Sequence, residues 1–297
     1  ELRRVHTVFS RNEEGLSVMS QMFRTFVIKR GTVLVNACTV KLENATHSSQ
    51  DINTDGFIHS ILELNEYCKT ILNECFCRST RDGPMTDACF QTALKDAFEC
   101  LINHDMGNVG FPEMLASFCD KSLQNIGIIK ILKRKSSEME AEKLCNQCAD
   151  IFDYIADKDL FAGHYKSLLA RRLLNETSYS QDLEKSMITQ LKSRCGAQYT
   201  AKLEGMLSDL SAANDLKLDF SKYLHEHTHS LELLRSFSVR ILSMAHWPAY
   251  PINNANLPAS MQECINVFEI FYKNKMVHHL ITWALSIGKI LYELDPH

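Results

Sequence analysis

The 297-residue sequence has little net charge and no long apolar run, and these two absences exclude several classes of protein. Its formal net charge is only −4 at pH 7, which predicts neither a nucleic-acid-binding surface nor attraction to an anionic membrane. A membrane-spanning helix needs about 20 mostly apolar residues, and no such run occurs. The length suits two or three compact units, each with its own core.

Recognisable catalytic motifs are also absent. The sequence contains no GxSxG elbow, no glycine-rich phosphate loop, no HExxH and no pair of carboxylates spaced for acid–base chemistry. Such motifs matter because their spacing brings nucleophiles, phosphate-binding amides or metal ligands together. We therefore expect no enzymatic activity, no cofactor and no metal ion.

The cysteines do not form a disulfide framework. Their number, eleven, is odd, and they are scattered through helical patterns, whereas disulfide frameworks belong to small secreted domains. Cys68 and Cys75, for example, lie on the same apolar stripe as Ile61. We expect a reducing compartment, the cytoplasm and nucleus. The chain begins with Glu1 and no signal peptide follows, so we expect it to be a piece of a longer polypeptide.

Residues 51–56 (Asp-Ile-Asn-Thr-Asp-Gly) are similar to the start of a calcium-binding loop. That loop needs a bidentate glutamate at its position 12, where this sequence has Leu62, with Glu63 one residue late. One residue turns a helical side chain by about 100°, so Glu63 would not reach the ion. We expect a turn that caps the following helix.

Two further patterns have the spacing of metal ligands. Cys145 and Cys148 form a CxxC pair, but no second pair exists and both lie in a helical stripe, which favours a place in the core. His225, His227 and His229 alternate in a polar stretch without a second ligand cluster. A solvated linker is therefore favoured over a metal site.

Arg171 and Arg172 stand at the end of a predicted helix, where cations interact favourably with the helix dipole. Two interpretations stay open for this pair, a solvated helix end and a docking contact.

Apolar residues recur at helical spacing through the first 125 residues. The polar stretches 38–56 and 78–87 separate the stripes and are expected to be connections. The stripes comprise Leu16, Met19, Phe23, Phe26 and Val27; Ile61, Leu64, Cys68, Ile71, Leu72 and Cys75; Phe90, Leu94, Ala97, Phe98 and Leu101; and Leu115, Phe118 and Cys119.

Four more amphipathic stripes follow between Leu144 and Leu210. Gly196 stands just after the third stripe, where a left-handed cap is common. Four such helices bury their apolar faces only against one another, which predicts a helical bundle. The stripes comprise Leu144, Cys148, Ile151, Phe152 and Ile155; Phe161, Tyr165, Leu168, Leu169 and Leu173; Leu183, Met187, Ile188, Leu191 and Cys195; and Tyr199, Leu203, Met206, Leu207 and Leu210.

The period changes beyond the bundle. Apolar and polar residues alternate from Phe237 to Leu242, which predicts a strand that ends at Trp247 and Pro248. Another helix is expected after Pro258, and a second strand over residues 280–285.

Short strings in this order and spacing resemble the cullin family. The strings in the bundle are Tyr154-Ile155, Asp157 to Phe161, Leu169 to Leu174, Glu184 to Met187, Leu191-Lys192, Cys195-Gly196 and Lys202 to Met206. Other strings resemble the plant branch that serves F-box ligases: Arg11 to Ser17, Met22 to Arg24, Leu115-Ala116, Phe118 to Asp120, and Leu257-Pro258.

The resemblance implies a mainly α fold in three parts. Residues 1–134 would be part of the third and last helical repeat of the cullin arm. Residues 135–234 would be the four-helix bundle that opens the cullin homology domain, and residues 235–297 the truncated start of an α/β region.

The resemblance also implies a function, that of a non-catalytic scaffold in a cullin-RING ubiquitin ligase. A RING-box protein would bind the α/β region by adding a strand and would bring the ubiquitin-conjugating enzyme indirectly. An adaptor and F-box receptor would bind through repeats that this chain does not contain. The residues expected at the RING-box site are Phe237, Val239, Ile241, Trp247, Leu280, Trp283 and Leu285.

The sequence departs from the family at this expected site. Most relatives have a glycine two residues before Trp247, where this chain has Ala245, and two cations where it has His279 and Leu280. A lower local charge slows the approach of a partner, so we expect weak binding. Two alternatives stay open: a truncated cullin paralogue that no longer binds the RING protein, and an unrelated α-helical solenoid adaptor.

Overall fold

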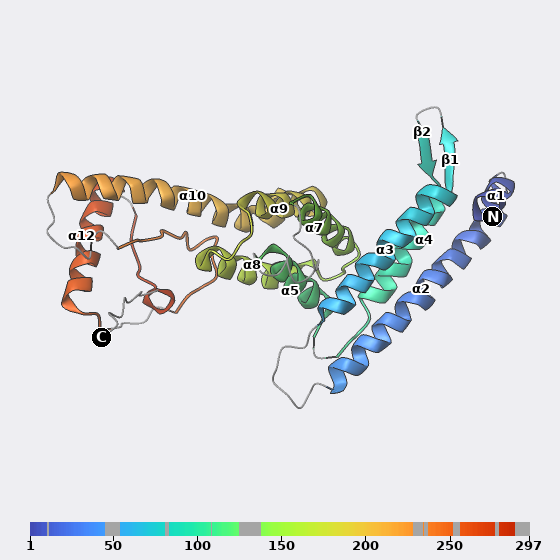
Figure 1. Ribbon diagram of the computed structural model, residues 1–297, viewed down its shortest axis with the longest axis horizontal. Helices are drawn as coiled ribbons and strands as arrows, with labels where there is room; N and C mark the ends of the chain where they lie inside the picture. The colour runs from blue at the N-terminus through green and yellow to red at the C-terminus, as the bar shows by residue number, and fades with distance from the viewer. Residues whose placement is uncertain are drawn as a thin grey trace, which may run out of the picture. The chain divides into compact units, whose positions relative to one another are not determined.

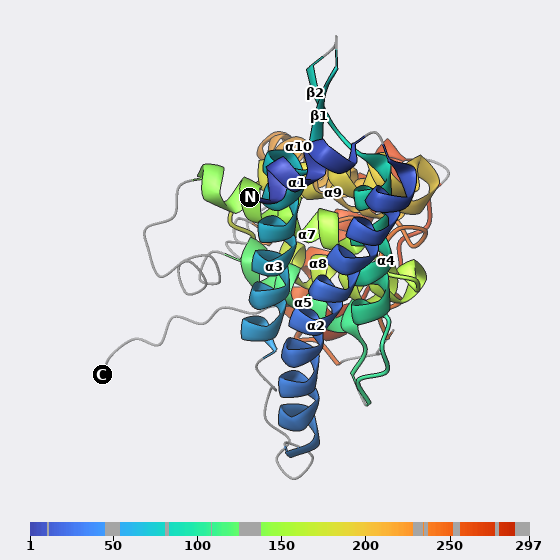
Figure 2. The same ribbon diagram turned by 90° about the vertical axis from the view of Figure 1, so that its right-hand side faces the viewer.

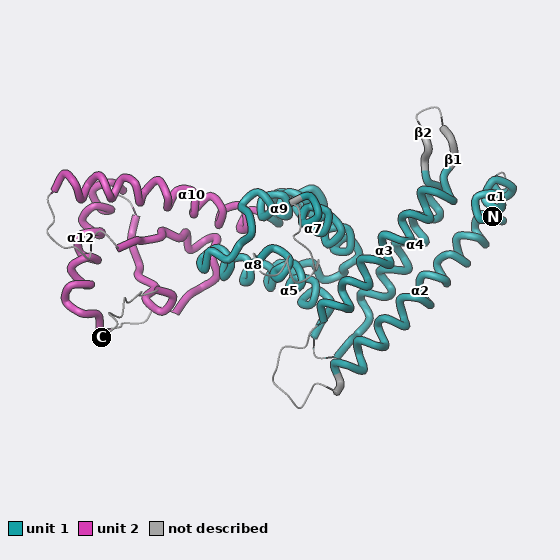
Figure 3. The backbone as a smooth tube through the Cα atoms, in the orientation of Figure 1, with its two compact units in different colours: residues 1–200 teal, residues 201–297 magenta. Residues whose placement is uncertain are grey.

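The computed structural model is helical almost throughout (Figure 1). Its described part contains ten α-helices, one β-hairpin and one 3₁₀ turn. The chain divides into two compact units, Glu1–Thr200 and Ala201–His297, which Figure 3 colours separately. The described residues are 1–10, 12–44, 54–80, 83–107, 109–124, 138–227, 234, 237–251, 256–276 and 279–288.

The first part of unit 1 is a layer of helices in which α2 packs against α3 and α4. The three helices run side by side in both views (Figure 1 and Figure 2). Most residues of the expected apolar stripes are buried, and in α4 all of them are, but Phe26 of α2 is exposed. Helix α2 also continues to Asn44, so residues 38–44 are helix and not the predicted connection. The helices are α1 (Leu2–Phe9), α2 (Glu13–Asn44), α3 (Asp55–Cys75) and α4 (Ala88–Ile102).

Aromatic rings hold one end of this layer together. Phe76 and Phe90 stack with centroids 4.1 Å apart, and Phe23 meets Phe76 edge-on at 5.6 Å. His6 of α1 is buried against the same rings, and its Nε2 lies 2.6 Å from Asp87 Oδ2. His6 is the only buried residue of the short helix α1, so this contact fixes α1 to the layer.

A hairpin joins α3 to α4, where the sequence indicated only a polar connection over residues 78–87. Strands β1 (Cys77–Thr80) and β2 (Gly83–Thr86) pair antiparallel, with Cys77 opposite Thr86. The prediction was incomplete because four-residue strands are too short to show a clear alternation of apolar and polar residues.

The second part of unit 1 is a bundle of four helices: α5 (Phe111–Leu123), α7 (Glu138–Phe152), α8 (Lys158–Asn175) and α9 (Gln181–Cys195). In it α5 packs against α7 and α8, and α7 packs against α9. The sequence predicted all four as helices, but it placed α5 ahead of the bundle and counted the stripe from Tyr199 to Leu210, which lies in α10 (Ala197–Glu226), as the fourth bundle helix. Unit 1 ends inside the predicted 135–234 domain, and the domain boundaries at 134 and 234 stay a prediction.

The ends of the bundle helices show why they stop where they do. The Asp157 carboxylate accepts a hydrogen bond from the Leu160 amide at 2.9 Å and caps α8. Gly196 follows α9 with a positive φ of 84°, and its N–H donates to the Lys192 carbonyl at 2.8 Å. This is the glycine that the sequence marked as a helix end, and a positive φ suits a residue without a Cβ.

Unit 2 contains most of α10 (Ala197–Glu226), together with α12 (Ala259–Lys275) and the 3₁₀ turn η1 (Leu285–Ile287). The two predicted strands are wrong. Residues 237–243 and 279–284 belong to no helix and form no ladder with any described residue, and Leu285 opens the 3₁₀ turn. Alternation shows which side chains face inward, but a strand also needs a neighbour, so the described residues form no α/β region.

No helix within the described ranges combines the length and the apolar character that a bilayer crossing needs.

Candidate partner-binding site

Unit 2 brings four of the seven predicted site residues together. Phe237, Val239, Ile241 and Trp283 pack, partly buried, against one apolar core. Ser238 and Arg240, between them, are exposed, so this segment keeps the alternation of a strand. The fully buried residues of the core are Leu216, Phe220, Leu234, Cys264, Phe268, Phe271 and Tyr272.

Phe268 of α12 is the centre of this core. Its ring meets the rings of Phe237 and Trp283 edge-on, with centroids 6.5 and 6.0 Å away. It also meets Phe220 of α10, with ring centroids 5.1 Å apart. Edge-to-face pairs at these distances are favourable, so one ring holds both extended segments and α10 against α12.

Hydrogen bonds fix the second extended segment along α12. The Trp283 indole Nε1–H donates to Glu269 Oε1 at 2.9 Å. Near the start of the segment, the Tyr272 hydroxyl and His279 Nδ1 are 3.1 Å apart. Burial raises the pKa of Tyr272, so its hydroxyl stays protonated at neutral pH and remains able to donate.

Trp247 lies elsewhere in unit 2, against α10. It is 3% exposed, and its Nε1–H donates to Asp209 Oδ2 at 2.8 Å. The backbone N–H of Ser243 donates to the same carboxylate oxygen at 2.9 Å. Trp247 thus anchors this part of the chain to helix α10.

The remaining two predicted residues are outside the cluster. Leu280 is 98% exposed, and Leu285 is half-buried in the turn η1. Met244, between Ser243 and Trp247, is also largely exposed. Unit 2 therefore presents apolar side chains to solvent next to its extended segments.

An ion pair joins the two helices of unit 2 at its surface. Lys275 in the last turn of α12 donates to Asp219 of α10. The hydrogen bond and charge of Lys275 lower the pKa of Asp219. Both side chains are partly exposed, so solvent screens the pair and it adds little to stability.

A second polar cluster, which sequence reasoning missed, lies inside the bundle of unit 1. Arg172 of α8 is 0% exposed. Its Nε and Nη2 donate to Glu184 Oε1 and Oε2 at 2.8 and 2.9 Å, and its Nη1 donates to Asp120 Oδ1 at 2.6 Å. Arg171 is exposed, but its Nη2 also reaches Asp120 Oδ2 at 3.0 Å.

Both interpretations of Arg172 from the sequence were wrong, because its guanidinium is neither solvated nor free to dock a partner. One signal was available: Arg172 lies three residues after Leu169 and seven after Tyr165, which places it on the buried face of its helix. Burial lowers the pKa of Arg172, but the hydrogen bonds and charge of Glu184 outweigh it and keep the pKa above its usual value.

The cysteine pair lies in the core, as predicted. Cys145 and Cys148 are both buried in α7, and burial raises the pKa of the Cys145 thiol to about 12. His225 lies in the last turn of α10, while His229 is outside the described residues. Among those residues, no three His, Cys, Asp or Glu side chains are grouped to hold a metal ion.

The calcium-like stretch is only partly visible. Thr54 is the N-cap of α3, which Asp55 and Gly56 open, whereas residues 51–53 are outside the described residues. A helix does begin at this place, two residues earlier than predicted, but Thr54 makes no side-chain capping hydrogen bond, so the predicted capping turn stays a prediction.

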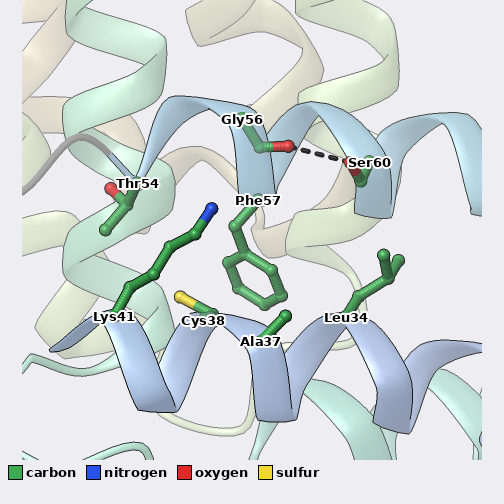
Figure 4. Close-up of a pocket in the computed structure, with 8 residues that line it drawn as sticks. All are labelled: Leu34, Ala37, Cys38, Lys41, Thr54, Gly56, Phe57 and Ser60. Carbon is green, nitrogen blue, oxygen red and sulfur yellow. Dashed lines mark hydrogen bonds between the residues drawn. The ribbon is translucent and has the colours of Figure 1, made fainter. Parts of the chain in front are cut away.

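A small cavity of about 130 Å³ lies between α2 and α3 (Figure 4). The Phe57 ring reaches from α3 toward Ala37 and Cys38 on α2. Burial raises the pKa of Cys38, and the charge of Lys41 opposes this only in part, so the thiol is a poor nucleophile. The cavity lining offers no constellation for catalysis. It comprises Leu34, Ala37, Cys38, Lys41, Thr54, Gly56, Phe57 and Ser60.

Comparison with known proteins gives one consistent result. Residues 1–217 match the family model of the cullin alpha solenoid domain. The chain is 34% identical over 291 residues to Cullin-1 of Oryza sativa subsp. japonica, covering 97% of this chain and 37% of that protein. It is 29% identical over 290 residues to Cullin-2 of Arabidopsis thaliana, with the same coverages. It is 30% identical over 302 residues to Cullin-1 of Dictyostelium discoideum, covering 97% and 36%.

Proposed function

Because this chain belongs to the cullin family, we propose that it is part of the non-catalytic scaffold of a cullin-RING ubiquitin ligase. The chain spans about 37% of the length of the rice and Arabidopsis relatives, so the role is that of one section of the scaffold. A scaffold accelerates transfer by holding two reactants at a productive distance. Closely packed helices suit this task, because packed interiors deform little.

One apolar face supports the assignment of the N-terminal helices to a repeat of the cullin arm. Five exposed residues of α2 recur at spacings of four and seven along a single face of the helix. The terminal repeat of a solenoid usually has a polar outer face, whereas this one is apolar and suits a further repeat. The residues are Val18, Met22, Phe26, Val33 and Val40. An adaptor and F-box receptor would bind through such preceding repeats.

The binding of a RING-box protein rests on one observation. Side chains alternate between partly buried and exposed over residues 237–241, and no ladder of the described residues includes the segment 237–243. A partner strand adds to a free sheet edge through main-chain hydrogen bonds, while alternate side chains fix its register. The RING-box protein would in turn bring the ubiquitin-conjugating enzyme, in the cytoplasm and nucleus.

We expect this binding to be weak, micromolar or worse. Two extended segments are marginal as a sheet on their own, and His279 and Leu280 replace the two cations usual in the family. A lower local charge slows association. A truncated paralogue that no longer binds the RING protein is the second candidate, and the same two residues favour it. Membership of the family argues against an unrelated solenoid adaptor.

Calorimetry with a purified RING-box protein tests the proposal. The wild-type chain should give a measurable micromolar constant. Ser238→Pro, which removes an N–H from an exposed position of the extended segment, should weaken binding if the partner strand pairs along that edge. Ser238→Ala keeps the N–H and is the matched control. A folded wild-type chain that releases no heat at any concentration would favour the paralogue, and a nanomolar constant would refute weak binding.

A further inference from the structure

We propose that Gly205 and Asp209 of α10 form a seat for the turn Ser243–Trp247, and that this seat makes them positioning residues for a strand-adding partner. The seat places the extended segment 237–243, which runs directly into this turn. The partner role rests on the function proposed above, whereas the seat rests on the geometry of unit 2 alone.

Asp209 supplies the polar half of the seat. One of its oxygens, Oδ2, accepts both the Ser243 backbone N–H at 2.9 Å and the Trp247 indole N–H at 2.8 Å. The two donors stand at the two ends of the turn. Hydrogen bonds to an ionised carboxylate are stronger than those between neutral groups, so a single side chain holds the turn at both ends.

Gly205 supplies the other half, one helical turn away. A Cβ on Gly205 would lie 2.4 Å from both Cγ and Nδ1 of His246, so the imidazole rests directly on the helix backbone. Any other residue at 205 would displace the ring. Because glycine in a helix interior is less favourable than alanine, its presence at this contact is explained by the close approach of His246.

The turn itself is closed by its own backbone. The N–H groups of His246 and Trp247 both donate to the Ser243 carbonyl, at 3.0 and 3.3 Å. Residues 205 and 209 are four apart and therefore share one face of α10. The turn is closed by its own hydrogen bonds and contacts α10 at both Gly205 and Asp209. These two contacts fix its position along the helix.

The consequence for a partner concerns register. In an extended segment a shift of one residue exchanges the inward and outward side chains. The seat holds the segment in the register that turns Phe237, Val239 and Ile241 toward the core. A strand added to this segment would then meet a fixed pattern of outward groups.

The test begins with Gly205→Ala and the two indole N–H protons. Trp247 donates to Asp209, whereas Trp283 donates to Glu269, so Trp283 is an internal reference in the same spectrum. By local opening, we expect hydrogen exchange of the Trp247 indole to accelerate about tenfold while that of Trp283 stays unchanged. Single Trp→Phe variants assign the two signals.

Two further variants separate the seat from general effects. Gly205→Ala combined with His246→Ala removes the clash and should restore slow exchange of the Trp247 indole. Gly163→Ala places alanine in α8, where a Cβ meets nothing within 4 Å, and it should leave both indoles unchanged. Unchanged Trp247 exchange in Gly205→Ala, or failure of the double variant to restore it, overturns the seat.

The same variants are then titrated with the RING-box protein. Gly205→Ala should weaken binding by about tenfold, a size typical of interface coupling, and the double variant should recover it. If the wild type binds and Gly205→Ala binds equally well despite faster Trp247 exchange, the positioning role is refuted. If the wild type does not bind at all, the proposed function and the positioning role both fail. The exchange rates of the Trp247 indole still test whether Gly205 and Asp209 hold the turn.

Discussion

Unit 1 and unit 2 differ in how much of their structure is helical and in how fully their apolar side chains are buried. The bundle of unit 1 is built from helices, which close their backbone hydrogen bonds internally, and its apolar stripes are buried almost completely. In the core of unit 2, several partly buried residues, among them Phe237 and Trp283, come from segments outside any helix or ladder of the described residues. The bundle of unit 1 thus closes its own core with helices, whereas unit 2 builds part of its core from segments outside any helix or ladder of the described residues.

The two units also place their charges differently. Unit 1 buries Arg172 between Asp120 and Glu184, an arrangement that tolerates no missing member. Unit 2 keeps its ion pair of Asp219 and Lys275 at the surface. The stability of unit 1 therefore depends on a buried charge cluster. The stability of unit 2 depends mainly on the packing of its aromatic core.

The largest expected effect is from Leu191→Asp. Leu191 is fully buried in α9, and an unpaired carboxylate there costs several kcal/mol, a large share of a typical stability of about 5–15 kcal/mol. Helical circular dichroism should show the bundle unfolded. Met139→Asp is the control, because Met139 of α7 is largely exposed. If Leu191→Asp melts like the wild type, α9 has been placed with the wrong face inward.

The second largest loss of stability is expected from Arg172→Met. It leaves Glu184 buried without a cation and Asp120 with only the exposed Arg171, and breaking a buried pair costs about 3–5 kcal/mol. Chemical denaturation followed by circular dichroism measures the loss. Arg171→Met, which removes the exposed arginine on the same Asp120, should cost less than about 1 kcal/mol. Equal losses for the two variants would contradict a special role for the buried arginine.

Phe268→Ala should act on unit 2 alone. It removes the ring that contacts both extended segments and should cost about 3 kcal/mol. The sequence has only two tryptophans, Trp247 and Trp283, and both lie in unit 2, so tryptophan fluorescence reports its unfolding. The fluorescence transition should move to lower denaturant than the transition of the bundle. Ile270→Ala, at an exposed position of α12, is the control, and coincident transitions in Phe268→Ala would show that the two units unfold as one.

The smallest effect concerns thiol reactivity and leaves stability unchanged. With a pKa of about 12, Cys145 carries about one thiolate in ten thousand thiols at pH 8, and the thiolate is the reactive form. Alkylation of the native chain should therefore modify the exposed Cys100 first and leave Cys145 intact. Because the thiolate fraction grows with pH, protection of Cys145 should weaken above pH 10. Early modification of Cys145 at neutral pH would mean that the bundle core opens readily.

The fold of unit 1 could be predicted largely from periodicity. The stripes through Phe90 in α4 and Phe161 in α8 are buried as expected, because a wide apolar face leaves a helix few other ways to pack. Arg172 escaped prediction because its partners Asp120 and Glu184 lie 52 and 12 residues away in the sequence. Helical spacing marks a buried face but does not reveal which charges meet there.

The site in unit 2 was predicted only in part, for a related reason. The alternation at Phe237, Val239 and Ile241 correctly indicated which side chains face inward, because extended geometry alone sets that period. It also indicated strands, which the described residues do not form, since a strand needs a neighbour that alternation does not supply. The role of Gly205 escaped prediction because its use depends on His246, 41 residues away.

The contact of His6 with Asp87 has a consequence for how the chain folds and how it is degraded. An isolated helix of eight residues is not stable in water, so α1 is helical only while its single buried side chain stays docked on Phe76 and Phe90. Release of His6 would leave α1 without a buried contact and would uncover the rings of Phe76 and Phe90. Helix α1 should therefore unfold locally before the helices it packs on, and this local unfolding would open residues 1–10 to a protease.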